Sequence, residues 1–414
     1  MSRLIDQAGL TAGSGLNAGA GLYKWPSFNP FDPLDLDPYL LFDAESSMRG
    51  TLEAPTLDLD PRNQETLDVI TAVRAGVATY TDASGNIATA AADTVRVDHV
   101  DGVPMILVEP SATNLVEYSE DFSNSYWTKS GTSSVTSNTT ISPDGTVNAD
   151  TISNATGTST GDTVFRTINP TDVDHTFSAY VKSAGATTMS LYMRNGITGI
   201  ILSQVISLTD EWQRVTLTHN IQNGQIIFGN SDGDFAVWGA QLETGSVATS
   251  YIPTSGGNEA ARTRAADDLV ITGSAFSDFY NQSEGTFYVE SVPNENTVSS
   301  FLFDLTKISG ESERLLVYNT AGSQKVYLST ASTTWVDKII GVRPAAGALS
   351  RGAISYETNN VEASLDGVNM VPDTSATMST SIAKMTIGNR FENSFYFGGH
   401  IKRLIYWPTS SDRL

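Results

Sequence analysis

The most informative absence in this 414-residue sequence is cysteine, which does not occur at all. Without thiols, the sequence excludes a disulfide framework, cysteine-ligated zinc, iron–sulfur clusters and thiol catalysis. Histidine is nearly as scarce, with four residues at positions 99, 175, 219 and 400, which argues against a histidine-rich metal site. At about 150 residues per domain, the length predicts two to three domains, each able to bury a core without disulfides.

Long apolar segments are also missing, since no stretch approaches the roughly 18 consecutive apolar residues that cross a bilayer. The first 25 residues are rich in Gly, Ala and Leu, as in a flexible linker or a small docking peptide. Five residues interrupt any apolar core of a signal peptide there: Asp6, Gln7, Gly13, Ser14 and Asn17. We therefore expect no export signal and no membrane insertion.

Charged residues are few and unbalanced. They make up 17% of the chain, and 46 Asp and Glu against 24 Lys and Arg give a net charge of −22. Nucleic acid and anionic membranes repel such a chain, so neither is an expected partner. The polar surface must come largely from Ser, Thr, Asn and Gly, a composition that favours an extracellular β protein over a helical enzyme.

Short β-prone runs separated by Gly, Asn or Asp turns fill residues 111–254, with no helical period between them. This pattern predicts an antiparallel β-sandwich. Side-chain alternation separates an apolar face from a polar face in two successive strands. The apolar positions are Phe177, Ala179 and Val181 in the first strand and Met189, Leu191 and Met193 in the second.

The same pattern returns after a Gly-rich linker and predicts a second sandwich over residues 265–414. Residues 26–110 are interpreted as an irregular, β-rich connector, in which the turn at 82–86 joins two short strands as a hairpin. Residues 1–25 precede this connector as the linker or small docking peptide. The predicted fold is therefore all-β, with two antiparallel sandwiches in tandem.

Several motifs resemble those of tailed-phage virion proteins described as head-spike or tail-fibre proteins. They are TNLVEYSEDFSNSYWT at 113–128, SPDG at 142–145, VWGAQLE at 237–243 and TSYIPT at 249–254. In that family this module is a carbohydrate-binding-type jelly roll. The region upstream, with Arg96, Asp98 and Glu109, resembles the short element that precedes the module. Downstream, SLDG at 364–367 and FGGHIKRLIYWP at 397–408 resemble a laminin-G or concanavalin-like sandwich.

The resemblance implies a virion appendage that is assembled in the host cytoplasm and later exposed on the virion surface. Residues 1–25 would then anchor the protein to capsid or tail proteins, and the sandwiches would bind host-surface polysaccharide for adsorption. A homo-oligomer is expected because avidity compensates for weak single-site sugar binding. The alternatives are a purely structural capsid-decoration or tail protein and, third, a capsule depolymerase.

The sequence motifs argue against an enzyme. No spacing singles out the pair of carboxylates that a glycosidase requires. The G-x-S-x-G match at 157–161 lies in a Ser/Thr/Gly-rich loop without the strand and helix of a nucleophile elbow. We therefore predict a protein without catalytic residues.

Sugar binding has a physical basis in aromatic rings that stack on pyranose faces, flanked by groups that satisfy the hydroxyls. If the strands around 180 and 192 are neighbours, their polar faces present Tyr180, Lys182, Tyr192 and Arg194 together. These four residues are the predicted binding face, against the alternatives of an ordinary solvated face or an intersubunit contact. The tryptophans Trp127, Trp212 and Trp238 are expected in the core instead.

No cofactor is expected. A structural calcium ion is the alternative left open, because Asp121, Asp232 and Asp234 could supply oxygen ligands. Asp- and Gly-rich turns explain these residues equally well without a metal.

Overall fold

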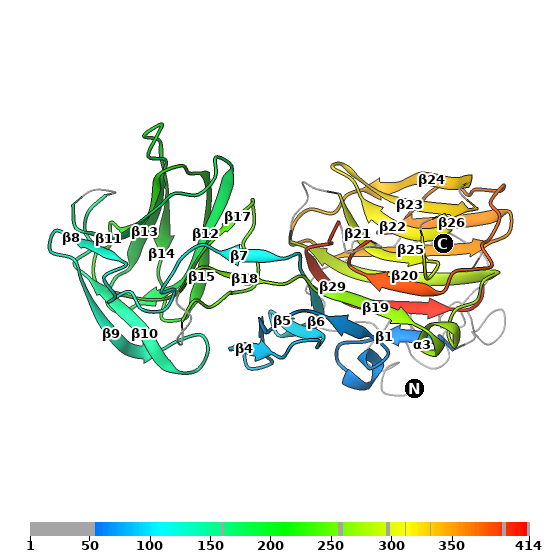
Figure 1. The fold of residues 1–414 in the computed structure, drawn as a ribbon, viewed down its shortest axis with the longest axis horizontal. Helices are drawn as coiled ribbons and strands as arrows, with labels where there is room; N and C mark the ends of the chain where they lie inside the picture. The colour runs from blue at the N-terminus through cyan, green and yellow to red at the C-terminus, as the bar shows by residue number, and fades with distance from the viewer. Residues whose placement is uncertain are drawn as a thin grey trace, which may run out of the picture. The chain divides into compact units, whose positions relative to one another are not determined.

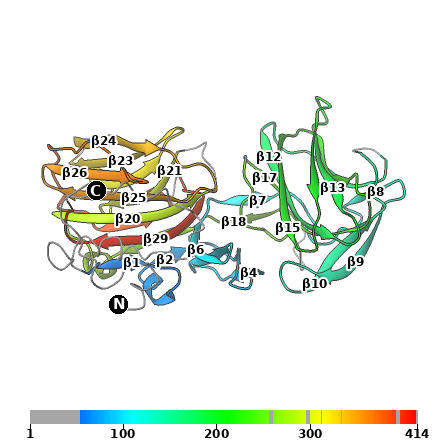
Figure 2. The ribbon, with the colours of Figure 1, turned by 180° about the vertical axis from the view of Figure 1, so that it is seen from behind.

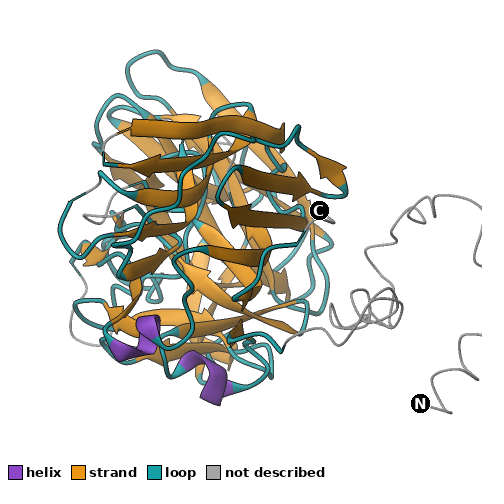
Figure 3. Ribbon diagram, turned by 90° about the vertical axis from the view of Figure 1, so that its right-hand side faces the viewer, coloured by secondary structure: helices purple, strands orange, loops and turns teal. Residues whose placement is uncertain are grey.

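The computed structural model describes residues 54–158, 161–255, 260–294, 299–310, 312–331, 333–390 and 395–411. It confirms the all-β class: antiparallel sheets stack as sandwiches (Figure 3), and the two described helices, η1 (Gln64–Leu67) and α3 (Ser274–Ser277), are four residues each. Neither helix has the length or hydrophobicity to span a bilayer. The predicted anchor at 1–25 lies outside the described residues.

The first sandwich, here called the N-sandwich, consists of two five-stranded sheets (Figure 1). The β12 sheet has the order β15 (Gln213–Asn220), β12 (Asp174–Ser183), β17 (Phe235–Thr244), β10 (Val147–Ser153) and β9 (Ser134–Ile141). The β13 sheet has the order β14 (Ile201–Ser207), β13 (Thr188–Arg194), β16 (Gly224–Gly229), β11 (Thr163–Ile168) and β8 (Thr128–Ser130).

Apolar side chains from both sheets form the core of the N-sandwich. The predicted inward positions of β12 and β13 all lie in this core: Phe177, Ala179, Val181, Met189, Leu191 and Met193. Phe228 of β16 packs among the rings of Phe122, Trp127 and Phe177, with centroid distances of 5.6, 6.0 and 5.5 Å. The period-2 pattern of the sequence therefore assigned the buried faces correctly.

The second sandwich, here called the C-sandwich, consists of one eight-stranded and one seven-stranded sheet. The eight-stranded sheet has the order β27 (Val368–Asn369), β26 (Asn360–Leu365), β25 (Ser350–Glu357), β20 (Glu284–Pro293), β29 (Gly399–Trp407), β6 (Val103–Val108) and β5 (Arg96–Val100), with β1 (Leu57–Leu59) also paired to β29. The seven-stranded sheet has the order β2 (Thr71–Val73), β19 (Asp268–Thr272), β28 (Lys384–Ile387), β21 (Ser300–Thr306), β22 (Arg314–Asn319), β23 (Ser323–Thr330) and β24 (Thr333–Val342).

The C-sandwich is discontinuous in sequence, which differs from the predicted boundaries of a connector at 26–110 and a sandwich at 265–414. Strands β1, β5 and β6 lie in its eight-stranded sheet and β2 in its seven-stranded sheet (Figures 1 and 2). The chain leaves through β7 (Ala112–Asn114) and returns through β18 (Arg262–Arg264), and these two strands pair with each other. Of the predicted connector, β3 (Ala78–Thr81) and β4 (Ile87–Ala90) form the expected hairpin.

The early strands are integral to the core of the C-sandwich. Leu59 of β1 and Val108 of β6 are fully buried in the same cluster as Phe287 and Leu404. Val108 also packs against the backbone of Gly388, where a Cβ atom would lie 2.6 Å from the Val108 Cγ1 and where φ is +73°. Only glycine meets both requirements at position 388 without strain. The N-sandwich is thus a long excursion between two halves of one buried core.

Candidate functional site

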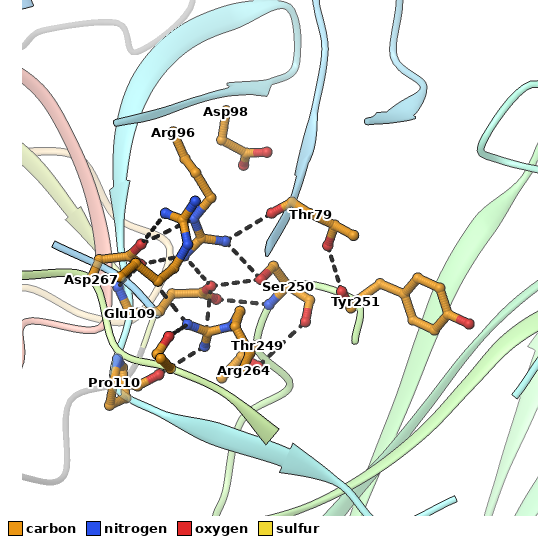
Figure 4. Close-up of polar contacts among 12 residues, drawn as sticks. Thr79, Arg96, Asp98, Glu109, Pro110, Thr249, Ser250, Tyr251, Arg264 and Asp267 are labelled. Atoms are coloured by element: carbon orange, nitrogen blue, oxygen red, sulfur yellow. Dashed lines mark hydrogen bonds and ion pairs between the residues drawn. The ribbon is translucent and has the colours of Figure 1, made fainter. Parts of the chain in front are cut away.

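A buried cluster of five charged residues lies where the chain enters and leaves the N-sandwich (Figure 4). The members of this arginine–carboxylate cluster are Arg74, Arg96, Arg264, Glu109 and Asp267, each at most 3% exposed. The Arg96 Nη2 lies 2.7 Å from the Glu109 Oε2 and also pairs with Asp267. The Arg74 Nη1 lies 2.8 Å from the Asp267 Oδ1, and the Arg264 Nη2 lies 3.4 Å from the Glu109 Oε2.

Polar groups of the chain itself provide further hydrogen bonds to this cluster, although the Nε atoms of Arg74 and Arg264 are buried without a partner in the described residues. Both the backbone N–H and the hydroxyl of Ser250 donate to Glu109, each at 2.7 Å. The carbonyl of Thr79 accepts from the Arg96 Nη1 at 2.8 Å, and the carbonyl of Pro110 accepts from the Arg264 Nη2 at 2.8 Å. With its charges buried and paired in this way, the cluster has a structural rather than a ligand-binding role.

The cluster makes stability depend on pH. Burial by itself would raise the pKa of Glu109, but the charges of Arg264 and Arg96 and the hydrogen bonds from Ser250 hold it well below its usual value. Because the folded-state pKa is depressed, the stabilisation is complete above the usual pKa of 4.5 and is lost as the pH falls below it. We expect the free energy of unfolding, measured in urea from pH 7 down to pH 3, to fall steadily at the acid end.

The variant Glu109→Gln should show a shallower acid loss, since residue 109 no longer takes up a proton on unfolding. Glu65→Gln, on the exposed helix η1, is the matched control and should retain the wild-type slope. Equal slopes for the two variants would contradict a role for Glu109 in the acid response.

The four residues of the predicted sugar-binding face are not brought together. Tyr180 and Lys182 lie on β12, which pairs with β15 and β17, whereas Tyr192 and Arg194 lie on β13, which pairs with β14 and β16. Since β12 and β13 belong to opposite sheets of the N-sandwich, their polar faces point away from each other. The prediction that these strands are neighbours is wrong.

The connection between β12 and β13 explains this difference. Instead of closing a hairpin, residues 184–187 cross from one sheet to the other. The backbone N–H groups of Ala184 and Ala186 both donate to the carbonyl of Asp234, at 3.1 and 2.8 Å. The side chain of Asp232 accepts from the N–H groups of Thr187 and Thr188, at 2.8 and 2.9 Å. These bonds tie the crossing to the turn between β16 and β17.

The predicted residues have other partners. The ring of Tyr180 packs against Trp238 and Tyr251, with centroid distances of 5.5 and 6.4 Å, and burial raises the pKa of its hydroxyl. Lys182 places its Nζ 5.2 Å from the ring centre of Trp212, and Tyr192 is buried. Trp127 and Trp238 are buried as predicted, whereas Trp212 is only half-buried.

A polar cleft in the N-sandwich is the better candidate site. Its volume is about 370 Å³, within the range of small-ligand pockets. Its lining, here called the acidic cleft, carries carboxylates, amides, hydroxyls and one aromatic ring: Tyr118, Glu120, Asp121, Ser123, Ser137, Asn138, Asn148, Asp150, Thr254 and Ser255. No lining residue is cationic.

Three of the motifs that the sequence analysis singled out meet at this cleft. Ser119, from the first motif, hydrogen-bonds to the Tyr251 hydroxyl at 2.6 Å, and its N–H donates to the Thr254 hydroxyl at 3.1 Å. Asn114 donates through its Nδ2 to the carbonyls of Ala240 and Ile252, at 3.1 and 2.9 Å. These buried bonds fix the loop that carries Tyr118 and Glu120 against β17 and the segment after it.

Two carboxylates of the cleft, the buried Asp150 and the half-buried Glu120, are held in place by the protein. The Oδ1 and Oδ2 atoms of Asp150 accept from the backbone N–H groups of Asn138 and Phe122, at 3.0 and 2.8 Å. The Glu120 Oε1 accepts from the Tyr251 hydroxyl at 2.8 Å. Burial raises the pKa of both Glu120 and Asp150, and the nearby charges of Asp144 and Asp121, respectively, add to this effect.

Hydrogen-bonding capacity remains at the cleft surface. Asn148 is half-buried, and its Nδ2 lies 3.3 Å from the Glu120 Oε2. Ser137 and Asn138 project from β9 at exposed positions. The cleft therefore offers several donors and acceptors beside the Tyr118 ring, which is the chemistry that a hydroxyl-rich ligand requires.

The remaining sequence candidates have local structural partners. Asp121 accepts from the N–H of Asn124 at 3.0 Å and from the Ser123 hydroxyl at 2.6 Å. Within the described ranges, no group of three or more His, Asp or Glu residues has the arrangement of a metal site. The serine of the G-x-S-x-G match, at position 159, lies outside the described residues.

Sequence reasoning did not identify this cleft. Asp150 lies on β10 and Glu120 in a loop, 30 positions apart, and no local spacing links them. The one available signal was the set of motifs at 113–128, 142–145 and 249–254, which was used for the resemblance and not for the site. Motifs that are distant in sequence and rich in Ser, Thr, Asp and Asn could have indicated one shared polar surface.

No protein-family model and no curated protein matches the sequence. Solved structures that match include the CBM40 module of the Ruminococcus gnavus IT-sialidase bound to alpha2,3 sialyllactose. That match has 13% sequence identity and a TM-score of 0.30, and it covers 34% of this chain and 83% of the sialidase module. They also include domain 4 of AbnA, a GH43 extracellular arabinanase from Geobacillus stearothermophilus, in complex with arabinotriose. That match has 13% sequence identity and a TM-score of 0.31, and it covers 40% of this chain and 77% of the arabinanase domain. At this level of similarity, neither structure identifies a site or a ligand in this chain.

Proposed function

We propose that this chain is a non-enzymatic glycan-binding protein and that the acidic cleft of the N-sandwich is its sugar site. The observation that carries the proposal is the convergence of three carboxylates, two amides, hydroxyls and the Tyr118 ring on one cleft of about 370 Å³. Sugar hydroxyls both donate and accept, so carboxylates and amides can bind them in pairs while an aromatic ring covers an apolar face.

The charge of the cleft favours neutral glycans. Its lining includes Glu120, Asp121 and Asp150 and no cationic side chain, in a chain of net charge −22. Sialylated, sulfated or phosphorylated glycans would meet repulsion there, whereas uncharged hexoses and pentoses would not. Lys182 and Arg194, the cations of the initially predicted face, are not part of this cleft.

We further propose that the protein is a tailed-phage virion appendage, a head spike or fibre, that adsorbs to host-surface polysaccharide. The support is the resemblance of its motifs at 113–128, 142–145 and 249–254, of which the first and the last contribute residues to the lining of the cleft. In this proposal the protein is assembled in the host cytoplasm, exposed on the virion surface and attached to capsid or tail proteins through residues 1–25.

A hydrolytic role is the second candidate, because Glu120 and Asp150 share one cleft and both have a raised pKa. The hydrogen bonds argue for binding instead. Asp150 uses both oxygens to join β9 to the loop before Phe122, and Glu120 accepts from Tyr251. Asp150, whose two oxygens both accept backbone N–H bonds, has little capacity left for attack on a substrate or for proton transfer.

The test is binding of the full-length chain to an array of neutral, sialylated and sulfated oligosaccharides, followed by titration calorimetry with the strongest neutral probe. Ser137→Trp would fill the cleft and should abolish binding, and Asn148→Ala should weaken it about 10-fold, as for one lost hydrogen bond in a desolvated site. Ser134→Trp, on the same strand outside the cleft, and Asn86→Ala are the matched controls and should bind as wild type.

Binding that is unchanged in Ser137→Trp would refute the cleft as the sugar site. No binding to any array member would favour the purely structural alternative. Release of reducing ends from a bound polysaccharide, lost in Glu120→Gln, would replace the binding role with a depolymerase.

A further inference from the structure

Strand β14 (Ile201–Ser207) is an edge strand without the features that normally protect a sheet edge. It ends the β13 sheet, where β13 is its one strand partner in the described residues. Residues 195–209 contain no Asp, Glu, Lys, Arg or His, in a chain with 46 acidic residues. The strand also contains no proline, and its pairing with β13 runs from Thr188 to Arg194 without a register shift.

The other described edges are protected in known ways. Strand β24 carries Asp337 and Lys338, and its pairing with β23 has two register shifts. Strand β9 is uncharged but is built largely of Ser and Thr, and its pairing with β10 is also shifted twice. Strands β5, β8 and β15 carry charged residues, while β2 and β27 have only three and two residues. Among the described edges, β14 alone is long, apolar, uncharged and regular.

The backbone of β14 has hydrogen bonds to offer on its open side. Asn195 donates to the Ile200 carbonyl and Leu208 to the Thr187 carbonyl, each at 2.9 Å, at the two ends of the β13–β14 ladder. In an antiparallel pair, the N–H and C=O groups of successive residues point alternately toward the partner strand and away from it. The even-numbered residues of β14 therefore bond to β13. The N–H and C=O groups of Ile201, Ser203, Val205 and Ser207 therefore point to the open edge.

Apolar side chains surround these free backbone groups. Val205 is 66% exposed, and Ile197 and Ile200, in the preceding turn, are 61% and 57% exposed. Leu202, on the same side of the strand as the buried Ile206, is also exposed. A regular edge with this much apolar surface is a template for a further strand.

We propose that β14 pairs with β14 of a second copy of this chain, antiparallel about a two-fold axis, so that the β13 sheets of two molecules join as one sheet. A surface that binds its own copy must be complementary to itself. An uncharged strand meets this requirement, since antiparallel pairing offers each outward N–H a carbonyl of the other copy. Two molecules of net charge −22 are then joined at a segment that adds no repulsion of its own.

One consequence is a closed dimer, because the described part of each chain has one such edge and uses it in the contact. This proposal goes beyond glycan binding and does not depend on it. If both proposals hold, the dimer presents two acidic clefts, and avidity strengthens adsorption to a repetitive glycan.

The test is the molar mass of the full-length chain by light scattering during size-exclusion chromatography, across micromolar concentrations. The wild type should have twice the chain mass of 44.2 kDa. Val205→Lys buries an unpaired charge at the contact, and Ser203→Pro removes an N–H that faces only the open edge, so each should weaken dimerisation about 100-fold or more. Val371→Lys, at a position 80% exposed and distant in sequence, is the control and should remain dimeric.

Hydrogen exchange supplies an independent readout, since the amides of Ile201, Ser203, Val205 and Ser207 should become protected as the protein concentration rises. A monomeric wild type, a trimer, or a dimer that both β14 variants leave intact would overturn the proposal. So would protection of these amides in a monomer, which would indicate that another part of the same chain covers the edge. Circular dichroism of each variant establishes that loss of the dimer is not loss of the fold.

Discussion

Replacing Arg96 with methionine is expected to lower the free energy of unfolding of the C-sandwich by about 3–5 kcal/mol. The reason is that Arg96 is the residue that contacts both carboxylates of the buried cluster most closely, at 2.7 Å from Glu109 and in a direct pair with Asp267. Methionine fills a similar volume but leaves two carboxylates, each 2% exposed, without their main counter-charge.

The other arginines cannot take over this role in their present positions. Arg74 already donates to Asp267 and to the carbonyls of Thr94 and Ala91. Arg264 lies farther from the carboxylates, at 3.4 Å from Glu109 and 3.9 Å from Asp267. The Arg96→Met variant should therefore hold an incompletely compensated buried charge, which costs more than the pair contributes when intact.

Urea unfolding monitored by circular dichroism measures this effect. Arg62→Met is the matched control: Arg62 pairs with Asp60 at 2.8 Å, but its side chain is 51% exposed, so its loss should change stability by about 0.5 kcal/mol or less. If both variants lost the same small amount, the cluster would contribute no more than a surface ion pair.

Replacing Phe228 with alanine is expected to destabilise the N-sandwich by about 3–5 kcal/mol. Phe228 is fully buried, and its ring contacts those of Phe122, Trp127, Phe177 and Phe235. Because the surrounding rings come from the facing β12 sheet and from the 118–127 loop, they cannot collapse into the space without moving a strand or the loop. The cost therefore includes the cavity as well as the lost apolar burial.

Differential scanning calorimetry and the fluorescence of the buried tryptophans measure this change, with Ile141→Ala at a 57% exposed position of the same sandwich as the control. The control should stay within about 0.5 kcal/mol of wild type. Phe228→Ala should also weaken glycan binding, since Phe122 packs on Phe228 and donates its N–H to Asp150 of the cleft. A variant with wild-type stability would show that the aromatic cluster repacks without loss.

The internal faces of the strands could be predicted from local residues. Phe177, Ala179 and Val181 alternate with polar residues and lie in the core, because successive side chains of a strand point to opposite faces. The intervening Ser178 is buried as well, so the alternation predicted the direction of the side chains and not their exposure. The turn at 82–86 likewise predicted the β3–β4 hairpin, since its residues are those that tight turns favour.

Strand partners could not be predicted in the same way. The alternation in β12 and β13 is the same whether the connection at 184–187 closes a hairpin or crosses between sheets, and hydrogen bonds from a third segment, at Asp234, accompany the crossing. This error placed Tyr180 and Tyr192 on one face, when they lie on opposite sheets.

The sequence by itself therefore determined that the protein is all-β, which side chains of β12 and β13 face the core and that thiol chemistry is excluded. The tertiary structure decided that β1, β2, β5 and β6 complete the C-sandwich, and that Glu120, Asn148 and Asp150 share a cleft. The physical reason is that the two properties depend on interactions over different distances along the sequence. Side-chain direction is set by the backbone of each residue, whereas pairing across the 112–264 excursion depends on hydrogen bonds and packing between segments that no local pattern records.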